Sequence, residues 1–585
     1  MKHGVRLIFA IAGTLVAVGA CSSASKELAS GYGPGADHGS NGGGAGTAPL
    51  PPGQSSGDPE QEVEPAFRVP VVSGHWVWTA NPTSGRVALI DASNFSVKTA
   101  LAGAAPTYLT ALPAPEGGSR ALVINSASED ATLLSAASDG EIEAIATMPV
   151  HAGANAWAVT ADGRFAIAWT DASAIKDADP SQGFQDITVL DLAADPPSSK
   201  RLSVGYRPAR VFVDDDDTHA YLATDAGIDV VDLTSSDGPV VEREVEISAR
   251  PATDSARRDV NVTPNGDYAF VRREGQSFVT VVDIARGQFK DVQLPGVVTD
   301  LDLTADAKLA VAVVRDPVTP QGDESPSDGG AAGAGGATAE AGAGGLAGEG
   351  GAAPAPTSPE PQPTRGSLAV LLPVAEIFDQ PTLFDSVKLD EVFGSVELGA
   401  RAATALLFTN AVPSTRLTLL GLADASHRTL DLKLPVFTAA SSPDGAHAIA
   451  LLQPPSGSEQ PGAFAVVPVA KNLPSKIQGT AARTVPVELS KDQPAMLAVG
   501  DQRALVTVSN GSDVNVSYLI SMPELTVDVF ALDSVPLPHA SGLVLEANQA
   551  FVAQQHPEGR ITFIDLASKE QHTLTGFELS TKVGK

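Results

Sequence analysis

The sequence predicts an all-β fold assembled from about ten similar repeats, and three observations lead to this prediction. Short apolar runs alternate along the chain with turns that contain glycine, aspartate or asparagine. Apolar residues do not recur at the spacing of about 3.6 that an amphipathic helix requires. A strand-like run returns at intervals of roughly 40 to 50 residues, which is the period of architectures built from small β-sheets.

The turns between consecutive strands are the clearest local signals. They read Thr-Ala-Asp-Gly-Arg at 160–164, Thr-Pro-Asn-Gly-Asp at 263–267 and Ser-Pro-Asp-Gly-Ala at 442–446. Aspartate and asparagine tolerate the left-handed backbone conformation, and glycine adopts a positive φ without steric cost. Each turn lies between β-type runs, so each one predicts a β-hairpin.

The most regular run in each repeat is expected to be its third strand, and its best copies end in aspartate. These copies are at 87–91, 187–191, 228–232, 279–283 and 561–565, and fainter ones end near Leu134, Leu371, Leu420, Val467 and Ile520. The ten copies are 41 to 56 residues apart, except for one gap of 89. That gap contains a Gly/Ala/Pro-rich tract of 47 residues, and 42 residues remain when the tract is removed. We therefore expect the tract to be inserted within one repeat, between the neighbouring strands 309–314 and 367–372.

Four-stranded blades of a β-propeller produce repeats of this length and kind. The segment 76–91 carries an aromatic-Val strand, a glycine turn and a strand ending in Ile-Asp, and it resembles the YVTN-type propeller repeat. Because a single ring usually holds four to eight blades, ten copies predict either one large ring or two smaller rings. The first copy lacks a clear opening strand, which residues 577–583 could supply.

The N-terminus has the features of an export signal. Lys2 and Arg6 precede an apolar run of about a dozen residues, which is too short to cross a bilayer as a helix. The run ends in Val-Gly-Ala-Cys at 18–21, which resembles the lipobox of bacterial lipoproteins. This resemblance implies that Cys21 becomes the lipidated first residue of the mature protein, and that several acyl chains hold it at a membrane. Ser22, where an aspartate would favour the inner membrane, favours the outer membrane instead.

These features divide the chain into five parts. Residues 1–20 are expected to form a lipoprotein signal peptide, and residues 21–66 a lipid-anchored disordered tether that is too poor in large apolar side chains to fold. Propeller repeats are expected at 67–317 and again at 366–585. The intervening residues 318–365 form the Gly/Ala/Pro-rich insert, which is expected to be disordered.

Composition narrows the range of partners. The chain has 38 basic and 69 acidic residues, a formal net charge of −31, which argues against nucleic acid or anionic headgroups as the main partner. A cationic or neutral protein or glycan fits better. Cys21 is the one cysteine, so no internal disulfide is expected once it carries lipid.

The motifs that carry catalysis or bind cofactors are weak in this sequence. Gly-Gln-Ser-Ser-Gly at 53–57 matches a nucleophile elbow but lies in the expected tether, without the strand and helix that an elbow needs. The ten histidines form no pair at metal-ligand spacing, and His219 and His539 are expected to be solvated turn residues. Four consecutive aspartates at 214–217 lack the alternating ligands of a calcium loop and predict a solvated turn. Trp76 and Trp78 share one sheet face and are expected to pack between blades.

We therefore expect no catalytic, cofactor-binding or metal-binding residue, and a single modified residue, Cys21. The predicted function is a non-catalytic binding or scaffold module, lipid-anchored at the bacterial cell envelope and displayed on the periplasmic or surface side of the outer membrane. The alternative is a lactonase-like hydrolase, because some YVTN-type relatives are lactonases. That alternative depends on the resemblance alone, since no motif here carries the catalytic residues.

Overall fold

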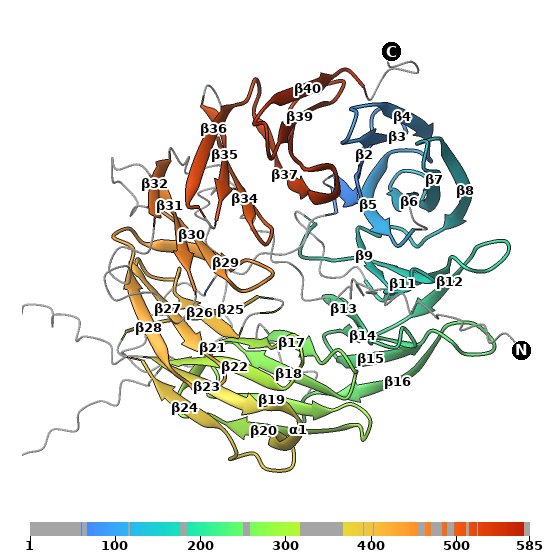
Figure 1. Ribbon diagram of the computed structural model, residues 1–585. Helices are drawn as coiled ribbons and strands as arrows, with labels where there is room; N and C mark the ends of the chain where they lie inside the picture. The colour runs from blue at the N-terminus through green and yellow to red at the C-terminus, as the bar shows by residue number, and fades with distance from the viewer. Residues whose placement is uncertain are drawn as a thin grey trace, which may run out of the picture.

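The computed structural model describes residue 60, residues 67–68 and residues 70–577, with gaps in the last range. The gaps are 115–116, 176–183, 250–257, 316–366, 390, 400, 402, 454–461, 470–482, 488–495, 510–513 and 523. The described chain forms ten antiparallel sheets of four strands each. These sheets are the blades of one β-propeller ring, and we number them 1 to 10 in chain order (Figure 1).

The four strands of a blade run in chain order from the centre of the ring to its rim (Figure 1). The first, innermost strands are β1 (Val71–Ser73), β5 (Pro106–Leu112), β9 (Ala156–Val159), β13 (Arg210–Val213), β17 (Arg258–Val262), β21 (Val297–Leu303), β25 (Ser395–Leu398), β29 (Val436–Ser441), β33 (Met496–Val499) and β37 (Pro536–Val544). The second strands are β2 (Trp76–Asn81), β6 (Ser119–Asn125), β10 (Phe165–Trp169), β14 (His219–Ala223), β18 (Tyr268–Arg273), β22 (Leu309–Arg315), β26 (Thr404–Phe408), β30 (His447–Leu452), β34 (Arg503–Ser509) and β38 (Gln549–Gln554).

The third strands are β3 (Arg86–Asp91), β7 (Asp130–Ala136), β11 (Asp186–Asp191), β15 (Gly227–Asp232), β19 (Phe278–Asp283), β23 (Ser367–Pro373), β27 (Arg416–Gly421), β31 (Gly462–Pro468), β35 (Asn515–Ser521) and β39 (Arg560–Asp565). The fourth, outermost strands are β4 (Val97–Leu101), β8 (Ile142–Pro149), β12 (Ser198–Ser203), β16 (Val240–Glu246), β20 (Gln288–Gln293), β24 (Asp385–Lys388), β28 (His427–Asp431), β32 (Arg483–Val487), β36 (Thr526–Ala531) and β40 (Gln571–Thr575). A one-turn helix, α1 (Val374–Ile377), follows β23, and a 3-10 turn, η2 (Leu545–Ala547), follows β37.

The burial of each strand explains its sequence pattern. All five side chains of β10 are buried, because the middle strands of a blade are covered by neighbouring blades on both faces. Such strands therefore consist of continuous apolar runs rather than alternating ones. The rim strand β12 of the same blade exposes most of its residues and buries only Leu202 fully. Its solvent-facing edge accounts for the polar composition of the fourth strands.

Ten apolar clusters hold the described part of the ring together, and each one joins two adjacent blades. One of them combines Val77 and Ile90 of blade 1 with Phe551 and Phe563 of blade 10. The last blade therefore packs against the first as any two consecutive blades do. The ring is closed, and the choice between one ring and two is decided in favour of one.

The predicted repeat is confirmed. Each of the ten markers, from Ile90 to Ile564, lies in the third strand of a different blade. The prediction for the first blade is wrong in one respect. Its innermost strand is β1, which pairs with β2 from Val71 opposite Trp78 to Ser73 opposite Trp76, so the blade needs no strand from the C-terminal end. Side-chain packing, rather than a shared sheet, closes the ring; residues 578–585 lie outside the described residues.

The Gly/Ala/Pro-rich insert interrupts a hairpin of blade 6, as predicted. Its flanking strands β22 and β23 are paired neighbours, with Val311 opposite Leu371 and Arg315 opposite Ser367. Residues 316–366 therefore leave and re-enter one sheet at the same end. The insert belongs to one blade and does not separate two domains.

Deleting residues 316–366 and joining Arg315 to Ser367 through Asn-Gly should preserve the fold. Two residues suffice because the ends are directly opposite in register, and Asn-Gly favours the tight turn that matches strand twist. Because each halving of loop length recovers about 0.6 kcal/mol of closure entropy, we expect a stabilisation of about 1–3 kcal/mol. Urea unfolding measures it. A variant that keeps a ten-residue Gly-Ser linker should gain less, and unfolding of both variants would contradict the prediction.

Candidate functional site

The two faces of the ring carry different chemistry. The turns between first and second strands and those between third and fourth strands lie on one face, because Trp76 at the start of β2 is paired with Asp91 at the end of β3. We call this the aspartate face. The opposite face carries the connections between second and third strands and between consecutive blades, and we call it the socket face.

Aspartates at the ends of third strands shape the turns of the aspartate face. Asp91 Oδ1 accepts a hydrogen bond from the Ser93 N–H at 2.8 Å. Equivalent bonds from the backbone to the other terminal aspartates recur around the ring, at Asp191, Asp232, Asp283 and Asp565. In blade 7 the third strand ends at Gly421, and Asp424 in the following turn accepts a similar bond from the Ser426 N–H. These are Asx-turns, in which a short carboxylate replaces a backbone acceptor. The aspartate that ends the repeat motif thus has a structural role. It is buried at Asp91 and Asp283, and partly exposed at Asp191, Asp232 and Asp565.

A second series of aspartates lies in the turns between first and second strands. In blade 3 the Thr160 N–H donates to the Phe165 carbonyl at 3.0 Å and Gly163 has φ of +67°. The side chain of Asp162 accepts from the Arg164 N–H. Blades 5, 6 and 8 repeat this turn, with Asn265, Asp306 and Asp444 at the position of Asp162.

The four consecutive aspartates form the same turn in blade 4. The Asp214 N–H donates to the His219 carbonyl at 3.1 Å, and Asp217 takes the left-handed position with φ of +55°. Asp217 also accepts from the N–H groups of Ala161 and Asp162 at 2.7 and 2.8 Å, which fastens blade 4 to blade 3. Burial raises the pKa of Asp217, and these two donors offset the rise only in part. The prediction of a turn is confirmed, but only the middle two carboxylates are fully solvent-exposed.

The socket face contains the most completely built polar site among the described residues. Glu60 lies there, between blades 6 and 7, with its side chain only 4% exposed. Its Oε1 accepts from Arg315 Nη2 at 2.7 Å and from Thr409 Oγ1 at 2.6 Å. Its Oε2 accepts from Ser395 Oγ at 3.2 Å and from the N–H groups of Asn410 and Ala411 at 2.9 and 3.2 Å. We call Arg315, Gly394, Ser395 and 409–411 the carboxylate socket.

The N-terminal segment contacts the ring at a second place. The Phe67 carbonyl accepts from the Leu109 N–H on the inner edge of blade 2 at 2.8 Å, and the Phe67 ring lies edge-on to Trp169 of blade 3. Arg68 donates to the Tyr108 hydroxyl at 2.6 Å. Blades 2 and 7 face each other across a ring of ten, so Glu60 and Phe67 bind on opposite sides. Glu60 thus has fixed contacts, although the tether that contains it was expected to be disordered.

Polar side chains also connect the innermost strands of blades 4, 5 and 6. Arg210 Nη1 lies 3.1 Å from Asp259 Oδ1, and Asn261 donates to the other oxygen of Asp259. Asn261 also donates to the Leu301 carbonyl at 3.1 Å. Each group is satisfied within the ring, so this chain of contacts aligns the strands that line the centre.

His151 is a buried titratable group between blades 2 and 3. Its two ring nitrogens lie 3.0 and 3.2 Å from the hydroxyls of Thr188 and Thr170, and burial lowers its pKa to about 4. The nearby Asp186 counteracts this only partly. Hydroxyl partners suit a neutral imidazole, so His151 is a structural residue that resists protonation.

Stability should therefore fall as the pH falls from about 6.5 to about 4. Over that range the unfolded chain protonates His151 while the folded protein does not, so the unfolded state binds more protons. The loss attributable to His151 is about 3 kcal/mol. Urea unfolding at several pH values measures it. In a His151→Asn variant the decline should be shallower by that amount, and an identical pH profile in both proteins would contradict this assignment.

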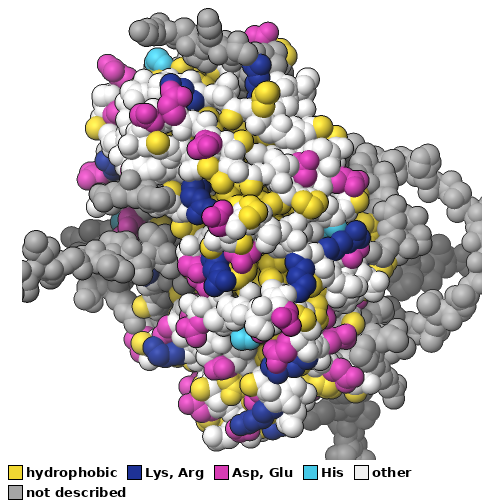
Figure 2. All heavy atoms as spheres, turned by 90° about the vertical axis from the view of Figure 1, so that its right-hand side faces the viewer, with side chains coloured by type: hydrophobic (Ala, Val, Ile, Leu, Met, Phe, Trp, Pro, Cys, Tyr) yellow, Lys and Arg dark blue, Asp and Glu magenta, His cyan; other side chains and the backbone are white. Residues whose placement is uncertain are grey.

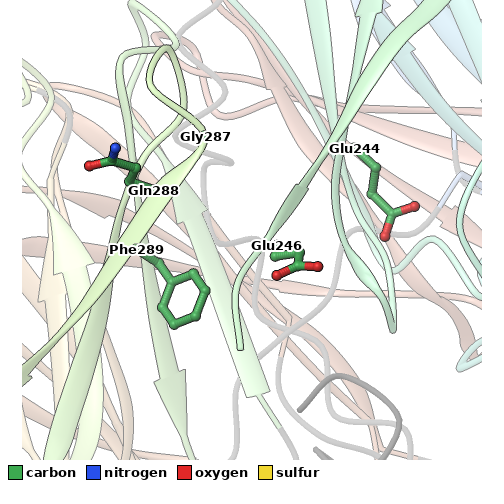
Figure 3. Close-up of a pocket in the computed structure, with 5 residues that line it drawn as sticks. All are labelled: Glu244, Glu246, Gly287, Gln288 and Phe289. Carbon is green, nitrogen blue, oxygen red and sulfur yellow. The ribbon is translucent and has the colours of Figure 1, made fainter. Parts of the chain in front are cut away.

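A shallow notch lies at the rim, between the outer strands of blades 4 and 5. Figure 3 shows its lining, with Glu244 and Glu246 on β16 and Gln288 and Phe289 on β20. The two glutamates are exposed, and no cation or buried polar group faces them among the lining residues. On the outer wall in Figure 2, acidic and basic side chains are interspersed with apolar ones. The notch therefore has no charge or apolar patch that distinguishes it from the rest of this outer wall as a binding site.

The sequence-predicted residues have different outcomes. Cys21 and the Gly-Gln-Ser-Ser-Gly segment lie outside the described residues. Trp76 and Trp78 pack between blades 1 and 2, as predicted, and Trp78 donates to Ser119 at 2.7 Å. The prediction of solvated turns for His219 and His539 is wrong, because both lie on strands and are partly buried. In the described part of the chain, no three His, Cys, Asp or Glu side chains gather as they would around a metal ion.

The carboxylate socket could not have been found from the sequence. Its ligand, Glu60, is 255 residues from Arg315 and about 350 from 409–411, and it lies in a polar segment without periodicity. Gly394 gives no stronger signal, since the chain has 55 glycines. Only the closed ring brings these residues together. Among the described residues, no helix is both long and apolar enough to cross a membrane.

Comparisons with known proteins find resemblances to solved structures only. No protein-family model and no curated protein sequence matches this chain. Solved structures that resemble it include a eukaryotic initiation factor, at 9% identity and a TM-score of 0.45, covering 86% of this chain and 96% of that one. Apo AztD from Citrobacter koseri has 12% identity and a TM-score of 0.36, covering 69% and 92%. The Swd1 β-propeller domain from Myceliophteria thermophila has 12% identity and a TM-score of 0.30, covering 66% and 94%.

Proposed function

We propose that this protein is a lipid-anchored binding or scaffold module of the cell envelope, and that it presents the aspartate face to a cationic partner. The observation that carries the proposal is the recurrence of aspartate on this face. Terminal aspartates of five third strands and the exposed turn aspartates of blades 3, 4, 6 and 8 all lie there. Arg164, Arg286 and Lys308 pair with aspartates of the same face and offset part of this charge. The remaining exposed carboxylates attract cationic surfaces and accelerate their association.

Glu60 binds on the socket face, so this chain's own N-terminal segment contacts the face opposite to the proposed binding surface. The proposal places the anchor in the outer membrane, with the ring on its periplasmic or surface side. No contact among the described residues favours the lactonase-like alternative.

The chain itself offers a substitution that tests the aspartate face. Asn265 occupies in blade 5 the position that Asp162, Asp306 and Asp444 occupy in their blades, and it accepts the same backbone hydrogen bond. Asp216 holds that position in blade 4. A quadruple Asp→Asn variant at 162, 216, 306 and 444 should therefore fold normally. It removes four negative charges from one face.

Affinity capture from isolated envelopes at 50 and 500 mM salt should distinguish the variants. We expect the wild-type ring to retain a partner at low salt and to release it at high salt, because screening shortens the range of surface charges. The quadruple variant should retain at least tenfold less of it. A Glu143, Glu244 and Glu246→Gln variant of the outer wall is the control and should bind as the wild type does. Equal capture by all three proteins would reject the aspartate face as the binding surface.

A further inference from the structure

The carboxylate socket surrounds a glutamate side chain with hydrogen-bond donors to both of its oxygens. Five donors reach the two oxygens of Glu60, one of them a guanidinium and two of them backbone N–H groups. Removing a carboxylate from water is strongly unfavourable unless charge-assisted hydrogen bonds replace its hydration. The socket provides that replacement completely, which is unusual for a residue from a segment that is not part of any blade.

The shape of the socket, as well as its charge, matches a glutamate side chain. A Cβ atom at Gly394 would lie 1.6 Å from Oε1 of Glu60, so any side chain at this position would occupy the space of the carboxylate. An aspartate in place of Glu60 would be one methylene shorter and would leave part of the five-donor set unpaired. The site therefore selects the length of the side chain in addition to its charge.

The ring holds the donors in place by contacts that do not involve Glu60. The Gly394 N–H donates to the Phe408 carbonyl at 2.9 Å, and the Val396 N–H donates to Asp300 of blade 6 at 2.8 Å. The side chain of Asn410 donates to the Phe437 carbonyl of blade 8 at 3.2 Å. The socket thus belongs to the framework of three blades, and it would keep its donors if Glu60 left.

We propose that the carboxylate socket is a peptide-binding site for a glutamate in an acidic segment, and that Glu60 of this chain occupies it in cis. Phe67, only seven residues further on, is held by blade 2, so the linkage keeps Glu60 at a local concentration in the millimolar range or above. An external acidic peptide therefore competes poorly with Glu60 in the native chain. The site lies on the face opposite to the aspartate face, so this inference does not depend on the proposed function.

A labelled peptide with the sequence of residues 56–64 tests the proposal by fluorescence anisotropy. The full-length Glu60→Ala variant should bind this peptide at least tenfold more tightly than the wild type does. It should also bind it at least tenfold more tightly than a peptide that carries Gln in place of Glu60. Free glutarate should compete only at much higher concentration than the unlabelled peptide, because it lacks the peptide backbone.

Two second-site variants separate binding in the socket from general charge effects. Glu60→Ala combined with Gly394→Val fills the space of the carboxylate, and Glu60→Ala combined with Arg315→Gln removes the cation without adding bulk. Both variants should lose peptide binding, and circular dichroism checks that each is folded. If the variant with Gly394→Val does not fold, the variant with Arg315→Gln alone tests the proposal. Equal binding of the Glu and Gln peptides, no binding by Glu60→Ala, or wild-type binding equal to that of Glu60→Ala would each overturn the proposal. Competition by glutarate at the same concentration as the peptide would overturn the assignment to a peptide.

Discussion

Replacing Phe563 with alanine should lower the free energy of unfolding by about 3–5 kcal/mol. Phe563 is fully buried in the cluster that joins blade 10 to blade 1. The centroid of its ring lies 5.5 Å from the ring centroid of Phe95 in blade 1. The substitution leaves a cavity at the closing interface, where no chain connection between the two blades limits their separation. Urea unfolding measures the loss, and limited proteolysis should show earlier cleavage in blades 1 and 10.

Phe270→Ala is the matched control for this effect. Phe270 is equally buried, in the cluster between blades 5 and 6, which the chain connects directly. We expect a similar loss of stability without increased cleavage in the first and last blades. A Phe563→Ala protein as stable as the wild type would mean that blades 10 and 1 are not packed together and that the ring is open.

Cys21→Ser should release the protein from membranes entirely. The lipobox resemblance implies that this thiol carries the lipid. Several acyl chains together hold a protein stably at a membrane, and the variant would have none of them. Fractionation of cells after labelling with radioactive palmitate measures both properties. The wild type should be labelled and sediment with membranes, whereas the variant should be unlabelled and remain in the supernatant.

Ser22→Ala is the control for the effect of a substitution next to the signal peptide. It leaves the thiol intact, so labelling and sedimentation should match those of the wild type. An unlabelled wild-type protein that still sediments with membranes would contradict the anchor on Cys21.

The number of blades and most of their boundaries could be predicted because they depend on local chemistry. Third strands such as β11 and β39 are covered on both faces, so their central four residues are buried and mostly apolar. The aspartate that ends them accepts hydrogen bonds from the next turn, so it recurs with the repeat. Even the interrupted blade was predictable, since the insert does not alter the strands beside it.

Side-chain roles were less predictable, because they depend on which blade lies next to a residue. The four aspartates at 214–217 look alike in the sequence but differ in their surroundings. Asp215 and Asp216 are exposed, whereas Asp217 accepts hydrogen bonds from a turn of the preceding blade. His219 looks like a turn residue in the sequence, yet it begins β14 and lies 3.2 Å from Asp214. The opening strand of blade 1 has only three residues, too few for a periodic signal.

The repeating unit, its period and the residues that form its turns follow from the sequence alone, because strand burial and turn geometry act over a few neighbouring positions. The tertiary structure decided that the ten blades form one closed ring and that Glu60 binds between blades 6 and 7. The number of blades in a ring depends on the angle at which whole blades pack against each other. No single position in the sequence encodes that angle. The socket joins residues that lie 255 to 351 positions apart, so no local pattern encodes it.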